Sequence, residues 1–219
     1  MSFKKKKYLI IKETIPQHLA TFLTGYFLLK RRVVKTFLSH RWISPFATEW
    51  GSWHDEQVPN TFSNYADIAM ENLLQMTRPL MEKKTGLKLV PTYSYARIYK
   101  KGDILERHKD RKSCEISTTI FLGGHVWPIF IEPDPKKGKF ISRGYMSANT
   151  KGIEILLQPG DMLIYKGRDL EHWREAFHGE YCVQVFLHYN RKGKNDNEFD
   201  GRPFLGLPAW FKEFTVPKK

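Results

Sequence analysis

The strongest constraint on the fold comes from residues 91–190, where short strand-like runs alternate with turn residues. The runs are TYSYARIY, EISTTIFL, VWPIFIE, IEILLQ, DMLIYK and YCVQVFLHY, all rich in β-branched and aromatic residues. The segments between them are KKGD, GGH, EPDPKKGK, QPGD and HGE, whose Gly, Pro and Asp residues favour turns. Many short strands joined by close turns predict an all-β sandwich or barrel.

The N-terminal part of the chain has a different pattern, which predicts helices. Residues 16–32 carry apolar side chains at helical spacing, and Pro16 suits a first helical turn. Before this helix, residues 8–13 (YLIIKE) predict a short strand. After it, residues 41–60 mix aromatic residues with Gly, Pro and Ser and predict an ordered loop.

Residues 63–86 give the clearest helical signal. Ser63 or Asn64 can cap its N-terminus, and Gly86 can end it. Pro79 lies inside this run, and a proline removes a backbone donor and clashes with the preceding turn. We therefore expect the helix to be kinked or split at Pro79.

Together these patterns predict one domain, mainly β with flanking N-terminal helices. The chain has 219 residues, 41% of them hydrophobic and 14% aromatic, which is enough for a sizeable core. We expect a helical support region over residues 1–90, a β core over residues 91–190, and a polar tail over residues 191–219 that packs back on the core.

The net charge of +13 allows two interpretations. A basic surface attracts nucleic acid or another polyanion, and it also keeps a protein soluble. The sequence has no aromatic-plus-basic repeat of the kind that marks a nucleic-acid module. Nucleic acid is therefore less favoured as a partner than the protein or peptide substrate to which the motifs below point.

The start of the chain and its cysteine content predict a cytoplasmic protein. The apolar run YLII after the basic start is too short for a signal peptide, and no run is long enough to span a membrane. Two cysteines, Cys114 and Cys182, cannot build a disulfide framework. We expect a reducing compartment and no membrane partner.

A His-x-Asp pair, His108 and Asp110, stands just before a predicted strand. On extended backbone, residues two apart point to the same side, so both side chains can face one metal ion. Two histidines and one carboxylate on one face leave the opposite positions open, which suits non-heme Fe(II) chemistry. A lone His-x-Asp pair also arises by chance as two solvated neighbours, so the hypothesis needs a third ligand.

Among the eight histidines, His172 is the best candidate for the third ligand. It follows a Pro-Gly-Asp turn, an apolar strand and a short loop, which places it at a strand edge in the β half. The alternative is that His172 is a histidine of the core or the rim of the barrel without a metal-binding role. The remaining histidines fit less well because they lie in a helix, in the N-terminal half, in turns or late in the last strand: His18, His40, His54, His125, His178 and His188.

The segments YKKGDILERHKD, ISTTIFL and LQPGDMLIYKGRDLEHW resemble the Fe(II)/2-oxoglutarate-dependent oxygenases, in particular the prolyl 4-hydroxylase-like branch. The resemblance covers Tyr93 to Tyr189. It implies a double-stranded β-helix, a jelly-roll or cupin-like barrel, with helices packed on one side. It also implies that His108, Asp110 and His172 form the facial triad that holds iron.

The same resemblance implies residues that bind 2-oxoglutarate. Tyr99 stands before His108 where family members often have a tyrosine that bonds the cosubstrate. Arg97 shares its face of the strand and could reach the same pocket. The alternatives are a core aromatic for Tyr99 and a surface charge for Arg97.

One departure from the family concerns the far carboxylate of 2-oxoglutarate. The family usually binds it with an Arg or Lys on the last barrel strand, but residues 181–183 hold no base here. An unpaired buried carboxylate is costly, so another group must serve. Arg174, just after the distal histidine, is the first candidate. Arg97 and the neutral Gln184 are the others.

The resemblance implies a dioxygenase that hydroxylates an unactivated C–H bond with Fe(II), 2-oxoglutarate and dioxygen, releasing succinate and CO2. Ascorbate is the reductant expected to keep the iron reduced. A residue of a protein or peptide, such as proline, is the first substrate class. A nucleic acid or a small metabolite is the runner-up. The alternative outside the enzymes is a non-catalytic cupin-like module that binds metal or a polyanion. The absence of an Arg or Lys at residues 181–183 favours this alternative.

Overall fold

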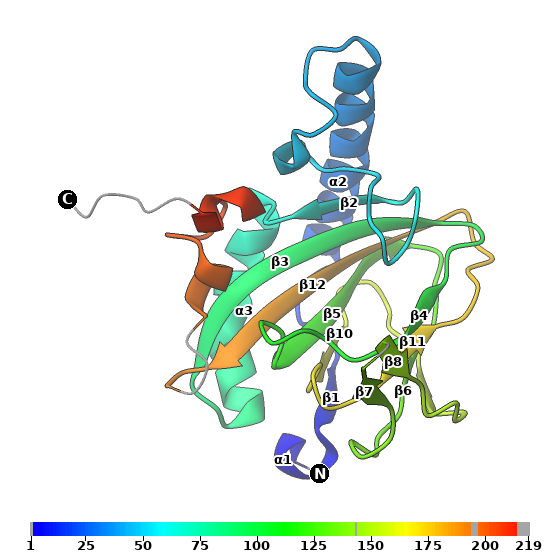
Figure 1. Ribbon diagram of the computed structural model, residues 1–219, viewed down its shortest axis with the longest axis vertical. Helices are drawn as coiled ribbons and strands as arrows, with labels where there is room; N and C mark the ends of the chain where they lie inside the picture. The colour runs from blue at the N-terminus through cyan, green and yellow to red at the C-terminus, as the bar shows by residue number, and fades with distance from the viewer. Residues whose placement is uncertain (1, 143, 194–196, 214–219) are drawn as a thin grey trace.

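Two facing antiparallel sheets form the centre of the fold in the computed structural model, which describes residues 2–142, 144–193 and 197–213 (Figure 1). The six-stranded major sheet has the order β1 (Tyr8–Ile11), β10 (Met162–Tyr165), β5 (Ile116–Gly124), β12 (Tyr181–Arg191), β3 (Leu89–Lys100), β2 (Phe62–Tyr65). The four-stranded minor sheet has the order β4 (Leu105–His108), β11 (His172–Arg174), β6 (Ile129–Ile131), β9 (Ile153–Ile155). A separate hairpin consists of β7 (Lys139–Ile141) and β8 (Gly144–Met146).

Helices cover the outer face of the major sheet (Figure 1). The long helices are α2 (Gln17–Ser39), which packs on β5, and α3 (Ile68–Thr85), which packs on β3 and β12. The short ones are α1 (Phe3–Lys6) and the 3₁₀ turns η1 (Thr48–Trp50), η2 (Glu198–Gly201) and η3 (Ala209–Glu213). Among the described residues, no helix combines the length and apolar character needed to cross a membrane.

The alternation of side chains along the major sheet creates two cores. On β12, Val183 and Val185 face the helices and join one apolar cluster. Their neighbours Cys182 and Phe186 face the minor sheet and join a second cluster inside the barrel. Because successive side chains of a strand point to opposite faces, each central strand needs apolar residues on both sides. This explains why these strands appear as nearly continuous apolar runs in the sequence.

The predicted fold class is confirmed, and every strand-like run of residues 91–190 contains a strand. Within residues 91–190, the hairpin β7–β8 and the strands β4 and β11 were not predicted. The hairpin β7–β8 lies in a segment that follows strong turn residues, and its strands are only three residues each. The three-residue strand β11 also lacks a sequence run of its own, since its pairing with β4 and β6 comes from the opposite side of the barrel.

The helix predicted over residues 63–86 begins later than expected, and it is not split at Pro79. Residues 62–65 form the edge strand β2, and the cap is Asp67, whose Oδ1 accepts the Met70 N–H at 3.1 Å. The helix runs through Pro79 without a break. Pro79 and Gln75 are both exposed, so the Gln75 carbonyl that Pro79 leaves without a donor can bond water.

Asp67→Ala is expected to lower the free energy of unfolding by about 2 kcal/mol. The loss of the N-cap alone costs about 1 kcal/mol. The buried Oδ2 also accepts bonds from Tyr26 Oη at 2.7 Å and Lys30 Nζ at 2.5 Å, which would lose their acceptor. Urea denaturation followed by circular dichroism measures the change. Asp67→Asn keeps the capping oxygen and should lose about half as much; equal losses would contradict the capping argument.

The C-terminal segment packs against β3 and α3 through buried ion pairs. Asp200 accepts bonds from Tyr65 Oη at 2.8 Å and from Arg111 Nη2 at 2.7 Å. Arg202 Nη2 donates to Glu71 Oε1 at 2.8 Å, and both side chains are buried. Apolar contact is limited, because Leu205 packs on the core whereas Phe204 is 57% exposed. Charged contacts therefore help to hold this segment, and it contacts Arg111, immediately after the His-x-Asp pair.

Candidate metal centre

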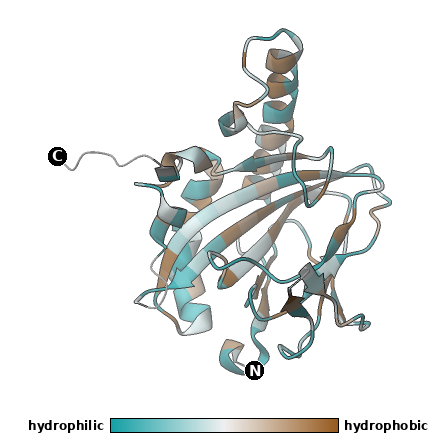
Figure 2. Ribbon diagram, in the orientation of Figure 1, coloured by the Kyte–Doolittle hydropathy of each residue, from teal (hydrophilic) through white to brown (hydrophobic). Residues whose placement is uncertain are grey.

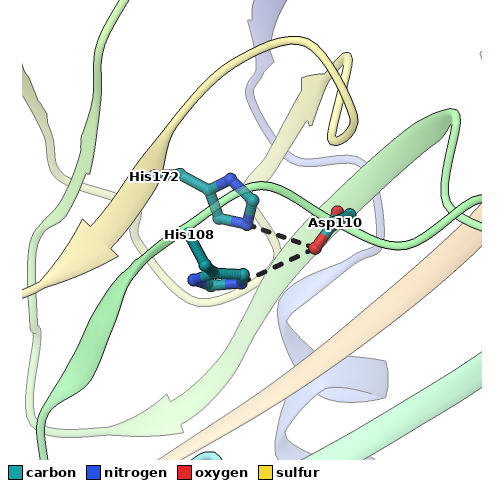
Figure 3. A group of neighbouring side chains, drawn as sticks. All are labelled: His108, Asp110 and His172. Atoms are coloured by element: carbon teal, nitrogen blue, oxygen red, sulfur yellow. Dashed lines mark ion pairs between the residues drawn. The ribbon is translucent and has the colours of Figure 1, made fainter. Parts of the chain in front are cut away.

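The end of β4 and the start of β11 bring the three predicted metal ligands together (Figure 3). His172 lies opposite His108 in the antiparallel register of the two strands, and their ring centroids are 4.2 Å apart. Asp110 Oδ1 lies 3.6 Å from His108 Nε2 and 3.4 Å from His172 Nε2. One ligand atom from each residue fits within 4.8 Å of the others, so a single ion can contact all three.

Backbone carbonyls orient both imidazole rings in the same way. His108 Nδ1 lies 2.7 Å from the Glu106 carbonyl oxygen, and His172 Nδ1 lies 3.0 Å from the Leu170 carbonyl oxygen. Each Nδ1 can therefore donate its proton to the carbonyl two residues earlier. This leaves the Nε2 lone pair of each ring directed toward Asp110, which is the tautomer that metal binding requires.

The Asp110 carboxylate is held in its ionised form. Burial raises the pKa of Asp110, but the positive charge and hydrogen bonds that His172 and His108 supply when protonated outweigh burial and bring the pKa well below its usual range. Ser117 Oγ donates to Asp110 Oδ2 at 2.7 Å, and the Asp110 backbone N–H donates to the Gly167 carbonyl oxygen at 2.9 Å. One carboxylate oxygen thus faces Ser117 and the other faces the two imidazoles.

Gly167→Ala is expected to weaken metal binding about tenfold, within the range seen when the support of a metal ligand is lost. A methyl group at Gly167 would lie 2.0 Å from Asp110 Oδ2 and 2.5 Å from Ser117 Oγ, so the carboxylate would have to move. Titration with Mn(II) or Co(II) measures the affinity. Gly25→Ala is the matched control, because its methyl group would meet no atom within 4 Å. Equal affinities of the two variants would contradict the proposed role of Gly167.

A cavity of about 330 Å³ opens directly on the three side chains. Its wall includes His188, whose Nδ1 lies 3.0 Å from Ser117 Oγ and whose pKa burial lowers to about 4, so the ring is neutral at pH 7. His188 was not predicted as a site residue because it lies late in the last strand. Its place two residues after Phe186, on the inward face, was the available signal.

The mouth of the cavity contains two residues that sequence reasoning missed. Asp55 pairs with Arg97 and accepts a bond from Tyr95 Oη at 2.5 Å. Gln57 accepts a bond from Arg97 Nη2 at 3.1 Å, and its Nε2 lies 3.0 Å from His108 Nε2. Both belong to the irregular segment between α2 and β2. Nothing in their local sequence indicates that this segment crosses the mouth of the barrel.

Glu171, directly before the distal histidine, anchors the hairpin β7–β8. Its fully buried carboxylate accepts bonds from Tyr145 Oη at 2.8 Å, Ser147 Oγ at 3.1 Å, the Ala148 N–H at 2.9 Å and Arg107 Nη1 at 3.2 Å. Burial raises the pKa of Glu171, but these bonds more than compensate and lower it overall. The hairpin is therefore tied to the strand that carries His172.

Several solved structures share this architecture across most of the chain. A prolyl-4-hydroxylase from Pseudomonas putida is 14% identical with a TM-score of 0.58, and the alignment covers 87% of this chain and 96% of that one. The α-ketoglutarate-dependent epimerase SnoN from nogalamycin biosynthesis is 13% identical with a TM-score of 0.62, covering 86% and 80%. HygX from Streptomyces hygroscopicus, solved with nickel and 2-oxoglutarate, is 12% identical with a TM-score of 0.56, covering 87% and 85%.

The chain has the double-stranded β-helix fold of the 2-oxoglutarate-dependent oxygenases. The resemblance found in sequence is thus confirmed at the level of the fold. No family model and no curated protein sequence matches the chain.

In this oxygenase fold, the inward face of the last strand offers Cys182 and Gln184 where a base is usual. Gln184 is already engaged, since its Oε1 accepts a bond from Thr119 Oγ1 at 2.9 Å and its Nε2 lies 3.2 Å from Cys182 Sγ. Burial raises the pKa of the Cys182 thiol, so it stays neutral. Neither side chain supplies a positive charge.

Arg174 on β11 supplies a cation inside the same barrel. It is only 1% exposed, and Nη1 donates to the Trp127 carbonyl oxygen at 2.5 Å. Its Nε and Nη2 are buried and have no hydrogen-bond partner among the described residues. Burial lowers the pKa of Arg174, as expected for a cation with no facing carboxylate. Buried unpaired donors are rare and call for a partner such as a water, an ion or a ligand, although Arg174 does not line the cavity at the metal centre.

The last two predicted residues, Arg97 and Tyr99, lie together on the inward face of β3. Arg97 Nη1 donates to Tyr99 Oη at 2.9 Å, and both side chains are buried. Arg97 lines the cavity, but its charge is already balanced by Asp55. Arg97 and Arg174 thus differ in one respect: the first has a carboxylate partner within the chain and the second has none.

Proposed function

We propose that this protein is an Fe(II)- and 2-oxoglutarate-dependent oxygenase that hydroxylates an unactivated C–H bond. The observation that carries the proposal is the cluster of His108, Asp110 and His172 on one wall of an open cavity. Two imidazole nitrogens and one carboxylate on one side of an ion leave the other side free for cosubstrate and dioxygen. The fold shared with 2-oxoglutarate-dependent enzymes supports the same conclusion.

The donor set fits iron in the proposed site. His108 and His172 would bind through Nε2 and Asp110 through Oδ1, with Ser117 and the two backbone carbonyls keeping each ligand in place. Bound iron and 2-oxoglutarate would together supply the activation of dioxygen, with succinate and CO2 as products. The chain's own task is to position the reactants and exclude bulk water.

We assign the far carboxylate of 2-oxoglutarate to Arg174. Its two unpartnered donors form one side of a planar fork, which is suited to a carboxylate. Tyr99 is the second group proposed to contact the cosubstrate. Arg97 ranks lower because Asp55 already neutralises it, and Gln184 ranks lower because its amide is engaged.

For the substrate, we propose a protein or peptide residue such as proline. The support is the similarity to a prolyl-4-hydroxylase and a cavity mouth rich in hydrogen-bonding groups, including Asp55, Gln57, Lys109 and Arg111. A small metabolite is the second candidate, because SnoN and HygX share the fold as well. A nucleic acid stays a third candidate on the basis of the net charge of +13.

The deciding experiment is the visible spectrum of the protein with Fe(II) and 2-oxoglutarate in the absence of oxygen. We expect a weak charge-transfer band from the iron–2-oxoglutarate chelate, absent in His108→Ala. On admission of oxygen the band should decay while succinate forms. If iron binds but no band develops, the chain does not bind 2-oxoglutarate at its metal, and a non-catalytic cupin-like binding module becomes the better description.

A further inference from the structure

The C-terminal half of α2 and the segment after it stand clear of the barrel (Figure 1). We call residues 28–54 the α2 lobe. Hydrophobic and hydrophilic bands alternate along this end of the helix (Figure 2). Two open hollows, of about 770 and 600 Å³, lie on the lobe and share Leu38 and Trp53 as walls. They are larger than the cavity at the metal centre and distinct from it.

The two hollows differ in chemistry. The larger is cationic, with Arg31, Arg32 and Lys35 in its wall. The smaller is apolar and aromatic, with Trp42 and Pro45 among its lining residues. Among the described residues, no acidic side chain lines either hollow. A ligand lying across both would meet positive charge on one side and apolar walls on the other.

Most cations of the lobe lack an ion-pair partner, and the exception is Lys30, which pairs with Asp67. Within the described ranges, the side chains of Arg31, Arg32, Lys35 and Arg41 form no ion pair. Glu49 is the only acidic residue in residues 28–54. Clustered cations with no internal counter-charge repel one another and favour a negatively charged ligand.

Aromatic side chains on the lobe are unusually exposed. Phe46 is 88% exposed, Trp42 68% and Trp50 43%. Trp42 and Trp50 both contact Phe37, with ring centroids 5.8 and 5.7 Å apart, so they are held in place rather than free. Exposed large apolar groups gathered in one place indicate an interaction surface, and Trp and Arg are the residues that dominate protein interfaces.

We propose that the α2 lobe docks an extended peptide that carries carboxylates beside proline or other apolar side chains. The carboxylates would pair with the cationic hollow, and the apolar side chains would enter the aromatic one. Aromatic-lined grooves suit proline-rich segments, whose extended conformation is formed before binding. Aliphatic walls such as Leu38 and Ile43 argue against single-stranded nucleic acid, which needs cations along its whole backbone and flat aromatic faces.

The lobe lies next in sequence to residues at the mouth of the metal cavity, which connects the proposed docking site with the metal centre. Trp53 and His54 line the smaller hollow, and the chain then continues within a few residues to Asp55 and Gln57 at the mouth of the metal cavity. A peptide held on the lobe could therefore extend to the cavity. That the docked peptide is the substrate rests on the proposed function. Docking itself does not, and it can be measured on metal-free protein.

The test uses fluorescein-labelled peptides and metal-free protein, followed by fluorescence anisotropy. The probe (Pro-Glu)6 carries both features of the proposed ligand. (Pro-Lys)6 reverses the charge, (Gly-Glu)6 removes the apolar rings, and the oligonucleotide dT12 offers charge without a peptide. We expect (Pro-Glu)6 to bind at least about tenfold more tightly than each of the others, a difference of about 1.4 kcal/mol.

Variants of the lobe assign the binding to its residues. The triple variant Arg32→Gln, Lys35→Gln, Arg41→Gln and the double variant Trp42→Ala, Phe46→Ala should each weaken (Pro-Glu)6 binding at least about tenfold. These side chains are exposed, so folding should be retained. The matched control is Lys83→Gln, Lys84→Gln, Lys101→Gln, which removes the same charge from exposed positions outside the lobe and should change affinity less than about twofold.

Three results would overturn the proposal. Absence of (Pro-Glu)6 binding would remove the docking site. Equal binding of (Gly-Glu)6 or dT12 would mean a general polyanion surface. Equal weakening by the lysine control would mean that net charge, and not the lobe, attracts the peptide. Because none of these measurements involves iron or 2-oxoglutarate, a failure here is distinguishable from a failure of the oxygenase assignment.

Discussion

His172→Ala is expected to lower the affinity for Fe(II) at least about a hundredfold and to abolish succinate formation. The ring supplies one of three protein ligands, and loss of even the residues that support a ligand costs about 10- to 100-fold. His188 and Cys114 also lie near Asp110, but among the described residues they do not cluster with His108, so they cannot restore the same three-ligand set. Anaerobic metal titration gives the affinity, and succinate formation gives the turnover.

The control for this experiment is His178→Ala. His178 lies six residues along the chain but is exposed and lines no part of the metal cavity. It should keep wild-type metal affinity and turnover. Because His172 is buried, circular dichroism must show that the His172→Ala variant is folded. A folded His172→Ala protein with full iron affinity would refute the proposed triad.

The ligand cluster could be predicted because its parts are local. His108 and Asp110 are two residues apart at the end of a strand, and strand geometry alone places them on one side. Local geometry could not place His172, because its distance from the pair depends on the antiparallel register of β4 and β11. The setting of His172 after a turn and a strand made it the best candidate, and the family resemblance implied the full triad. The alternation of β12 could also have identified His188, which shares the inward face with Phe186.

The rest of the site depends on contacts between distant segments. Asp55 and Gln57 reach the mouth from an irregular segment with no periodicity, so no pattern connects them with Arg97. The hairpin β7–β8 is held by Glu171 from across the barrel, and its own sequence contains mostly turn residues. Local propensity also misplaced the start of α3, because pairing with β3 overrides the capping preference of Ser63.

Arg174→Met is expected to separate cosubstrate binding from stability. In the free protein, Arg174 is a buried cation whose Nε and Nη2 have no partner among the described residues. Replacing a buried charge with an apolar side chain of similar length is often neutral or stabilising by about 1–4 kcal/mol. The metal-free variant should therefore unfold at the same or a higher urea concentration than the wild-type protein.

The affinity for 2-oxoglutarate should change in the opposite direction. Without Arg174 the far carboxylate would be buried with no cation, a loss of about 2–5 kcal/mol, or on the order of a hundredfold in affinity. Calorimetric titration of 2-oxoglutarate into the Mn(II)-loaded protein measures this loss. Metal affinity should stay unchanged, because a guanidinium has no lone pair to offer a metal ion.

Gln184→Met makes the comparison decisive. Gln184 lies on the inward face of the last strand, and unlike Arg174 its polar group already has hydrogen-bond partners within the chain. Its amide already bonds Thr119 and Cys182, so its removal should cost about 1 kcal/mol of stability and weaken 2-oxoglutarate binding less than about tenfold. A variant that gains stability while losing the cosubstrate is what a cation reserved for a ligand would produce. If instead Gln184→Met lost the cosubstrate and Arg174→Met kept it, the anion would lie against the last strand after all, held by a neutral amide.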